Sequence, residues 1–187
     1  MSALIYGALS SLDGFVSDPS GSFDWAAPDD ELMAAVNDLE SEIGTFLYGR
    51  RMYETMRYWE TADPDEAEEP LGAEFARNWL SADKIVFSTT LSDVTTARTK
   101  LLRTFDPEAI AEMKSSATRN LSVNGPTLAS AAFKARLVDE CHLFLQPVVV
   151  GAGLRTLPVV APLRLELINE RRFTSGALHL HYRVKST

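Results

Sequence analysis

The 187-residue sequence has little of what several classes of protein require. Its only cysteine is Cys141, so it cannot form an internal disulfide, and this suits a reducing compartment. No apolar run approaches the roughly 20 residues that a membrane-spanning helix needs. The formal net charge of −8 argues against nucleic acid or an anionic membrane as the main partner. The chain runs from Met1 into an apolar segment without a basic region or cleavage site, so we expect a cytoplasmic protein.

Several well-defined site motifs are absent too. There is no G-x-S-x-G nucleophile turn and no P-loop. The only histidines are His142, His179 and His181, and the last two share one face of an expected strand. No cysteine or acidic spacing completes a zinc pattern, so we interpret them as a packed or solvated strand face and expect no metal. Gly151 and Gly153 lack the third glycine of a dinucleotide fingerprint, and a tight turn explains them as well.

What the sequence does have is the composition and patterning of a globular α/β protein. Hydrophobic residues make up 45% and charged residues 24%, and the length suits one well-cored domain over 1–187. Strand-like and helix-like segments alternate early, and strand-like segments dominate late. This pattern favours one α/β sheet, mostly parallel, with an antiparallel C-terminal edge. Strands are expected at 3–9, 46–48, 84–88, 120–123, 140–150, 163–168 and 177–185, with helices starting near 28, 50, 71, 107 and 126.

The most informative segment is the strand-to-helix junction at 46–54. Its apolar run stops at Gly49 and continues as Arg50, Arg51 and Met52. The first N–H groups of a helix lack internal partners, and the helix dipole and two arginines add positive charge there. Such a junction can bind a phosphate group, and so a nucleotide cofactor. A purely structural helix start is the alternative.

A second junction of this kind follows the strand expected at 120–123. Gly125 permits close backbone approach and Thr127 offers an N–H and a hydroxyl, whereas Pro126 has no N–H to donate. A glycine near the helix N-cap followed by proline also has a structural explanation. Two such junctions in one α/β chain favour a dinucleotide.

A third polar group closes the strand at 84–88. Ser88, Thr89 and Thr90 stand at its expected carboxyl end, where ligands bind in open α/β sheets. These hydroxyls could hold a ribose phosphate beside Arg50 or Arg51. A polar strand exit is an equal alternative.

Taken in order, the motifs resemble the dihydrofolate reductase-like family. The nearer resemblance is to stand-alone relatives of the C-terminal reductase domain of the bacterial bifunctional riboflavin-biosynthesis enzyme. It covers essentially the whole chain, and it implies a three-layer fold with helices on both sheet faces, a homodimer, and NADPH as cofactor. The segments that carry it are Ser11–Gly14, Tyr48–Glu54, Ser88-Thr89, Asn124-Gly125, Leu137–Glu140 and Pro147–Gly153.

The resemblance also implies where NADPH binds. Residues 49–52 match the segment that holds the pyrophosphate and adenosine phosphate, 88–89 match positions beside the adenine ribose, and 123–128 match a glycine-rich turn across the pyrophosphate. The loop 12–25 matches a flexible lid over nicotinamide and substrate. The implied cofactor-binding residues are Gly49, Arg50, Arg51, Met52, Ser88, Thr89, Val123, Asn124, Gly125, Pro126, Thr127 and Leu128.

Substrate-site candidates come from the start of the first helix. In dihydrofolate reductases a tryptophan precedes that helix, three residues before a proline and five before an aspartate. The same spacing is present here in Trp25, Pro28 and Asp30. The matching carboxylate there holds the pterin ring and assists its protonation, so the resemblance makes Asp30 the catalytic candidate. Asp24 and Trp25 are the substrate-binding candidates. Helix caps mimic this arrangement, so a capping role for Asp30 stays open.

Two residues depart from the family pattern: Met52 stands where threonine is usual, and Pro126 interrupts a run of glycines. The zinc-binding pattern of a deaminase half includes Cys-x-x-Cys, which a sequence with one cysteine cannot contain. We therefore expect an NADPH-dependent reductase that transfers a hydride to a C=N-type acceptor in a small heterocycle, either pterin-like or ribosylaminopyrimidine-like. The alternatives are a dinucleotide-binding regulatory or sensor protein, which these two departures favour, and an oligomeric scaffold without a ligand.

Overall fold

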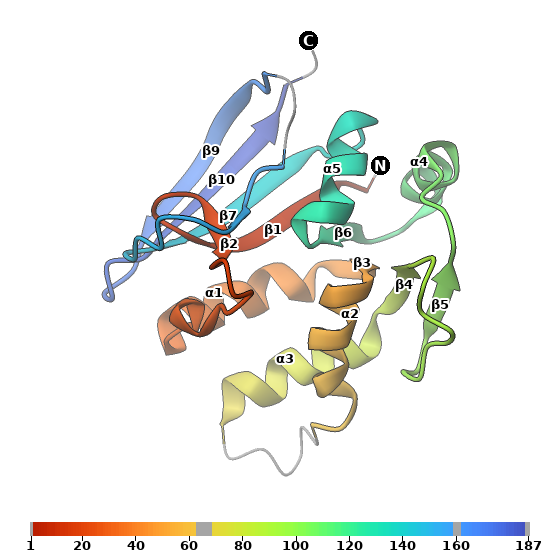
Figure 1. The fold of residues 1–187 in the computed structure, drawn as a ribbon, viewed down its shortest axis with the longest axis horizontal. Coiled ribbons are helices and arrows are strands. Elements are labelled where there is room, and N and C mark those ends of the chain that lie inside the picture. Colours follow the sequence, from red (N-terminus) through yellow and green to blue (C-terminus); the bar gives the residue numbers. More distant parts are fainter. Residues whose placement is uncertain (1, 63–68, 159–161, 186–187) are drawn as a thin grey trace.

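The chain folds around a central twisted sheet. The computed structural model describes residues 2–62, 69–158 and 162–185. Within these ranges eight strands form the sheet in the order β5-β4-β3-β6-β1-β7-β10-β9 (Figure 1). The strands are β1 (Leu4–Ser11), β3 (Ile43–Gly49), β4 (Asp83–Phe87), β5 (Thr99–Leu102), β6 (Asn120–Asn124), β7 (Glu140–Gln146), β9 (Leu165–Arg172) and β10 (Leu178–Val184).

The sheet is parallel except at one edge. β1 pairs in parallel with β6 and β7, β3 with β4 and β6, and β4 with β5. β10 pairs antiparallel with both β7 and β9. Parallel strands covered on both faces read as continuous apolar runs, as do the buried residues Leu4, Ile5 and Tyr6 of β1. The prediction of a mostly parallel sheet with an antiparallel C-terminal edge is confirmed.

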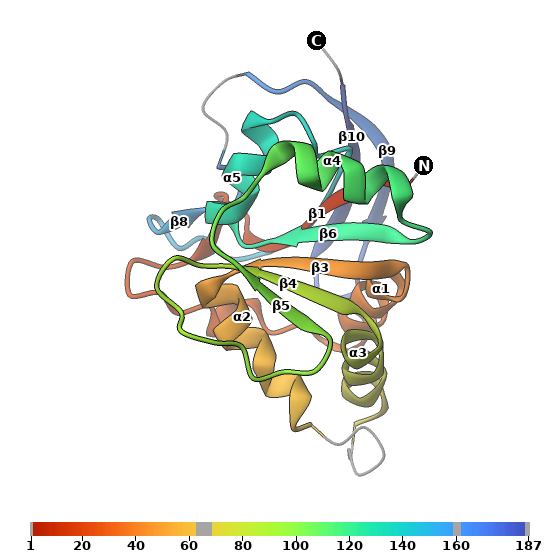
Figure 2. The same cartoon turned by 90° about the vertical axis from the view of Figure 1, so that its right-hand side faces the viewer.

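Helices cover both faces of the sheet (Figure 2). On one face, α4 (Pro107–Ser116) and α5 (Pro126–Lys134) bury Ile110 and Phe133 in a cluster with β1 and β6. On the other face lie α1 (Asp30–Ser41), α2 (Arg50–Met56) and α3 (Pro70–Ser81), where Tyr53 and Trp79 pack with β3 and β4. A short helix, η2 (Arg57–Glu60), follows α2 directly. The three layers implied by the resemblance are present.

The helix starts follow their sequence signals. Asp106 caps α4 by accepting a bond from the Glu108 N–H, and Pro107 occupies the first turn, where an N–H would lack a partner anyway. The first helix begins at Asp30, two residues later than the sequence indicates. Its cap is Asp29, which accepts from the Leu32 N–H at 2.8 Å.

The main differences from prediction are short elements. The loop expected after β1 contains β2 (Phe15–Ser17) and a 3-10 turn, η1 (Asp24–Ala26); β2 pairs with β8 (Leu154–Arg155). Two or three residues are too few for an alternating pattern, so neither strand was predicted. The edge strand β5 was missed as well.

Two strand boundaries were also predicted wrongly. β7 ends at Gln146 and not at Val150, because Pro147 has no N–H for the ladder. Arg171 and Arg172 belong to β9 and not to the turn after it. The sequence also indicates an acidic, proline-bounded loop at 63–70, and most of that segment lies outside the described residues. No helix within the described ranges is long and apolar enough to cross a bilayer.

Candidate cofactor and substrate site

The two glycine junctions predicted from the sequence lie side by side at the carboxyl edge of the sheet. β3 and β6 are neighbours, with Tyr48 opposite Asn124. A Cβ atom added to Gly125 would lie 3.5 Å from the Cβ of Met52, and one added to Gly49 would lie 3.8 Å from the Cβ of Leu128. The backbone of each junction therefore faces the helix of the other. The structure brings these sequence-distant segments into one site.

Both junctions leave their helix start without a side-chain cap. Gly49 and Gly125 are the N-cap residues of α2 and α5, and among the described residues neither helix has a capping side-chain bond. α1 and α4 are capped by aspartates, whereas α3 is uncapped and begins with proline. Gly125 has φ +86, a backbone conformation that favours glycine. The open N–H groups at this edge are suited to an anion.

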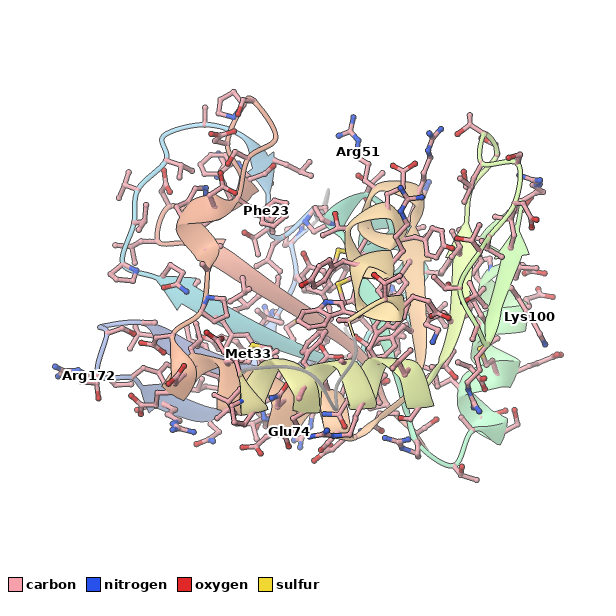
Figure 3. All side chains as sticks on the ribbon, turned by 90° about the horizontal axis from the view of Figure 1, so that it is seen from below. Phe23, Met33, Arg51, Glu74, Lys100 and Arg172 are labelled. Atoms are coloured by element: carbon pink, nitrogen blue, oxygen red, sulfur yellow. The ribbon has the colours of Figure 1, made fainter. Side chains whose placement is uncertain are left out.

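The two arginines of the first junction have different surroundings. Arg50 donates from Nε to Glu54 Oε1 at 2.8 Å and from a terminal nitrogen to Thr90 Oγ1 at 3.1 Å. It therefore connects α2 to the segment after β4. Arg51 is exposed, and Figure 3 shows it projecting from α2 at the same edge of the molecule as Phe23. Met52 is half-buried and packs on the apolar cluster beneath α2.

Ser88 and Thr89 follow β4, which pairs with β3 so that Phe87 lies opposite Gly49. The Ser88 side chain is buried, and its oxygen accepts from the Leu91 N–H at 3.0 Å and the Thr90 N–H at 3.3 Å. This hydroxyl shapes the turn that carries Thr90 to Arg50. Thr89 is exposed at the same edge.

The start of the expected lid is fastened to the segment after β7. Asp13 accepts from the Ser11 hydroxyl at 2.7 Å and from the N–H groups of Val150 and Gly151 at 3.2 and 2.7 Å. The Ser11 hydroxyl, followed by these backbone donors, holds the pKa of Asp13 below its ordinary value. The Gly14 carbonyl accepts a further bond from the Thr156 N–H. The turn at 11–14 is thus part of a bonded framework.

Gly153 is required where β2 meets β8. It has φ +142, and a Cβ atom added there would lie 1.9 Å from the carbonyl oxygen of Ser17. The sequence indicated only a tight turn at Gly151–Gly153. The structure shows that the absent side chain lets two backbones touch.

The indole N–H of Trp25 has no hydrogen-bond partner in the part of the chain that the structure describes. Trp25 lies in η1, which is held near the end of β7 because Gln146 Nε2 donates to the Ala26 carbonyl at 3.4 Å. Trp25 Nε1 is buried and has no hydrogen-bond partner within the described residues. Such orphaned donors are costly and are typical of sites that expect a ligand or water. Asp24 beside it is exposed and accepts from the Ser22 hydroxyl.

Asp30 is the exposed first residue of α1 and is not its cap. Asp29 supplies the cap, and its bond from the Leu32 N–H lowers its pKa. Glu31 accepts from the Thr174 N–H at 2.8 Å, which holds its pKa down too, and it pairs with Arg171. Both neighbours are therefore used structurally. The capping alternative for Asp30 is wrong, and its catalytic role stays a prediction.

A pocket of about 270 Å³ lies at the ends of β1 and β7. Leu143 and Leu145 place it on the α5 face of the sheet, whereas Phe144 packs toward α1. The structure therefore does not bring Asp30 into this pocket. The sequence analysis did not identify the polar lining residues Ser10, Arg155 and Thr156. The only indication in the sequence was that they lie close to the motifs at 11–14 and 147–153. The lining residues are Ser10, Gly14, Leu143, Leu145, Arg155, Thr156 and Leu157.

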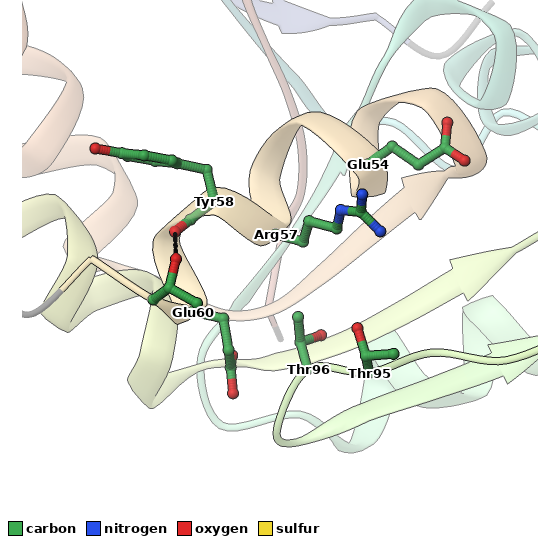
Figure 4. A pocket seen from close by; sticks show the side chains of 7 residues that line it. Glu54, Arg57, Tyr58, Glu60, Thr95 and Thr96 are labelled. Carbon is green, nitrogen blue, oxygen red and sulfur yellow. Dashed lines mark hydrogen bonds between the residues drawn. The ribbon is translucent and has the colours of Figure 1, made fainter.

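A larger pocket, of about 410 Å³, lies on the outer side of α2 (Figure 4). None of its lining residues was predicted as a site residue. The bond drawn there runs from the Thr61 hydroxyl to the Tyr58 carbonyl and belongs to the end of η2. The lining residues are Glu54, Arg57, Tyr58, Glu60, Thr61, Thr95 and Thr96.

Comparisons with known proteins agree with this arrangement. The chain is 27% identical over 173 residues to the uncharacterized protein YyaP of Bacillus subtilis, covering 91% of this chain and 89% of that one. A crystal structure of a candidate riboflavin biosynthesis protein from Shewanella sp. PV-4 has a TM-score of 0.76 at 19% identity, covering 98% and 99% of the two chains.

A second solved structure is longer than this chain. It is the diaminohydroxyphosphoribosylaminopyrimidine deaminase/5-amino-6-(5-phosphoribosylamino)uracil reductase of Thermotoga maritima, similar with a TM-score of 0.69 at 16% identity. The likeness covers 98% of this chain and 57% of that protein. The family model of the RibD C-terminal domain matches residues 2–178. The resemblance seen in the motifs is confirmed, and this chain belongs to the RibD C-terminal domain family.

Proposed function

We propose that this protein is an NADPH-dependent reductase of a small nitrogen heterocycle, of the ribosylaminopyrimidine or pterin class. The observation that carries the proposal is the pair of uncapped glycine junctions that meet at the carboxyl edge of the sheet beside Arg50 and Arg51. Family membership supports the same chemistry. A dinucleotide that carries phosphate groups would account for two uncapped helix starts beside arginines at one edge of the sheet.

The residues present fit the phosphates of such a cofactor. Gly49 and Gly125 leave space that a Cβ atom would fill, so backbone N–H groups can approach a pyrophosphate. Arg51 is exposed at this edge, and Arg50 is held over Thr90. Met52 costs the site a hydroxyl, but its half-buried side chain packs inward on the core. Pro126 removes one donor while the Thr127 N–H remains.

The chain's own groups then have the following roles. NADPH, when bound, supplies a hydride to a C=N-type acceptor. Arg50 and Arg51 bind phosphate through charge-assisted hydrogen bonds. The framework at 11–14 anchors the loop that excludes water. Trp25 Nε1–H offers a donor to the heterocycle, and Asp30 supports protonation of the acceptor nitrogen, directly or through water.

Arg51 provides a direct test of cofactor choice. The Arg51→Gln change is expected to weaken NADPH binding about tenfold, because one charge-assisted contact to a phosphate is lost. NADH binding should change less than about twofold, since NADH lacks the extra phosphate. Fluorescence titration with both cofactors measures this. Arg172→Gln changes an exposed arginine that lies far from Arg51 in Figure 3; it is the control and should leave both affinities unchanged. Equal and millimolar-weak binding of both cofactors to the native protein would refute NADPH dependence.

Asp30 is tested separately from binding. Asp30→Asn is expected to lower kcat about tenfold while NADPH affinity stays unchanged, because it removes a proton-supporting group and no cofactor contact. Asp29→Asn is the matched control: it removes the neighbouring carboxylate charge while asparagine still caps the helix, so it is expected to leave turnover nearly unchanged. Unchanged turnover in Asp30→Asn would remove its catalytic role.

A regulatory or sensor protein is the second candidate. Met52 and Pro126 favour it, because each removes a polar group from the proposed pyrophosphate-binding segments. It predicts NADPH binding without NADPH oxidation across a panel of pterins, pyrimidines, imines and quinones. Oxidation with any member of the panel decides for the reductase.

A further inference from the structure

A cluster of potential metal ligands lies at the other end of the sheet from the glycine junctions. His142 on β7 is directly opposite His181 on β10, in the antiparallel pair where the parallel sheet ends. Glu140 precedes His142 by two residues and so shares its face of β7. Glu140 is also the first residue of β7, whereas the cofactor edge lies at the carboxyl ends of the parallel strands. The cluster is therefore separate from the proposed cofactor site.

We propose that Glu140, His142 and His181 bind a divalent transition-metal ion, with zinc the best fit. Glu140 Oε2 lies 2.9 Å from His181 Nε2 and 3.7 Å from His142 Nε2, and the three ligand atoms all lie within 4.8 Å of one another. Tetrahedral zinc with bonds of about 2.0–2.1 Å places neighbouring ligand atoms about 3.3 Å apart. These two separations lie on either side of this value, so small side-chain adjustments close the site. Two imidazoles and one carboxylate leave a fourth position for water.

An unsatisfied atom points independently to a ligand. His142 is 8% exposed, and its Nε2 is buried without a hydrogen-bond partner within the described residues. Its other nitrogen, Nδ1, lies 3.1 Å from His179 Nε2. If Nδ1 carries the proton and donates to His179, Nε2 presents a bare lone pair toward the Glu140 carboxylate. A cation between them resolves this contact.

The surroundings resemble those of ligated histidines in general. A histidine that binds metal through one nitrogen commonly donates a hydrogen bond through the other, which sets its tautomer and orientation. His179 can accept that bond, and its own ring is held by stacking on Phe144 at 4.2 Å between centroids. The nearby Arg171 is paired with Glu31. His179 is therefore inferred to position His142 and not to bind the ion itself.

An ion can reach the cluster and would link two strands. The Glu140 and His181 side chains are 29% and 20% exposed, so a path from solvent exists. His181 Nε2 lies within hydrogen-bond distance of Glu140 Oε2, and metal binding through this nitrogen would exchange that contact for a coordination bond. The bound ion would connect β7 to β10. Its expected effect is to stabilise the antiparallel edge of the sheet.

The test uses the full chain without a histidine tag, first stripped of metal with a chelator. Calorimetric titration with Zn²⁺ is expected to show about one equivalent bound, and Co²⁺ should give the visible absorption of a low-coordinate site with nitrogen ligands. Glu140→Gln and His181→Gln should each weaken Zn²⁺ binding more than about tenfold, and His179→Gln about tenfold. Both ligand positions are partly exposed, and circular dichroism checks that the variants fold.

Glu170→Gln is the matched control, because this exposed carboxylate stands opposite Leu180, on the other sheet face from His181. It should bind Zn²⁺ like the native chain. The proposal is overturned if the native chain binds no Zn²⁺, or if Glu140→Gln and His181→Gln bind it as tightly as Glu170→Gln does. NADPH titrations on the same samples are expected to be unchanged, which keeps this result independent of the cofactor proposal.

Discussion

Replacing Gly153 with alanine is expected to lower the free energy of unfolding by about 3 kcal/mol or more, since backbone strain and overpacking each cost about 1–3 kcal/mol. The new Cβ would lie 1.9 Å from the Ser17 carbonyl oxygen, and φ +142 is unsuited to alanine. The obstacle is backbone, so no side chain can rotate away. Denaturant unfolding of the variant and the native chain measures the difference.

Gly151→Ala is the control for this prediction. Gly151 also has positive φ, at +80, but a Cβ there would meet no atom of the described residues within 4 Å. The Gly151→Ala variant should therefore lose only the free energy that a positive φ costs alanine, about 1–2 kcal/mol. If both variants lose the same stability, the close approach of Gly153 to Ser17 is not what the turn requires. The clash of the new Cβ with Ser17 should also displace the loop that follows β2. Gly153→Ala is therefore expected to reduce turnover as well.

Replacing Gly125 with aspartate is expected to weaken NADPH binding about a hundredfold, equivalent to roughly 2.7 kcal/mol. The substitution places a carboxylate at the uncapped start of α5, where the pyrophosphate is proposed to bind, and it fills the space beside Met52. Like charges at such a site repel strongly because solvent screening is incomplete. Fluorescence titration with NADPH provides the measurement.

Gly125→Asn separates charge from shape. Asparagine has nearly the same size as aspartate and meets the same strain at φ +86, but it carries no charge. It should bind NADPH more tightly than Gly125→Asp by about tenfold. Equal affinities of the two variants would show that no anion lies at this junction. Thermal unfolding of both variants checks that they are folded to the same extent.

Much of the fold follows from local patterns. Asp106 and Pro107 start α4 where the sequence indicates, because a cap and a first-turn proline act within a few residues. The parallel strands are recognisable as apolar runs, since helices bury them on both faces. β2 and β8 were missed because each exists only through its pairing with the other. Their position in the chain says nothing of that pairing.

The candidate site also combines residues that the sequence identifies with residues that only the structure brings together. Gly49 and Gly125 are visible as junction residues because each follows an apolar strand, and family resemblance joins them to a cofactor. Asp30 could not be distinguished from a cap by sequence, since Asp29 and Asp30 have the same chemistry one residue apart. The bond from the Leu32 N–H assigns the cap to Asp29. Arg155 and Thr156, which line the pocket by β1 and β7, follow the 147–153 segment without a motif of their own.

By itself the sequence determined the α/β class, the order of most strands and helices, and the two glycine-bearing helix starts, because these depend on residues within about one helical turn or one strand of each other. Only the tertiary structure decided that Gly125 faces Met52, that Gly153 touches Ser17, and that His181 stands opposite His142. These neighbours are brought together by strand order and register. Pairing across a sheet depends on the packing of the whole core, which no local pattern contains.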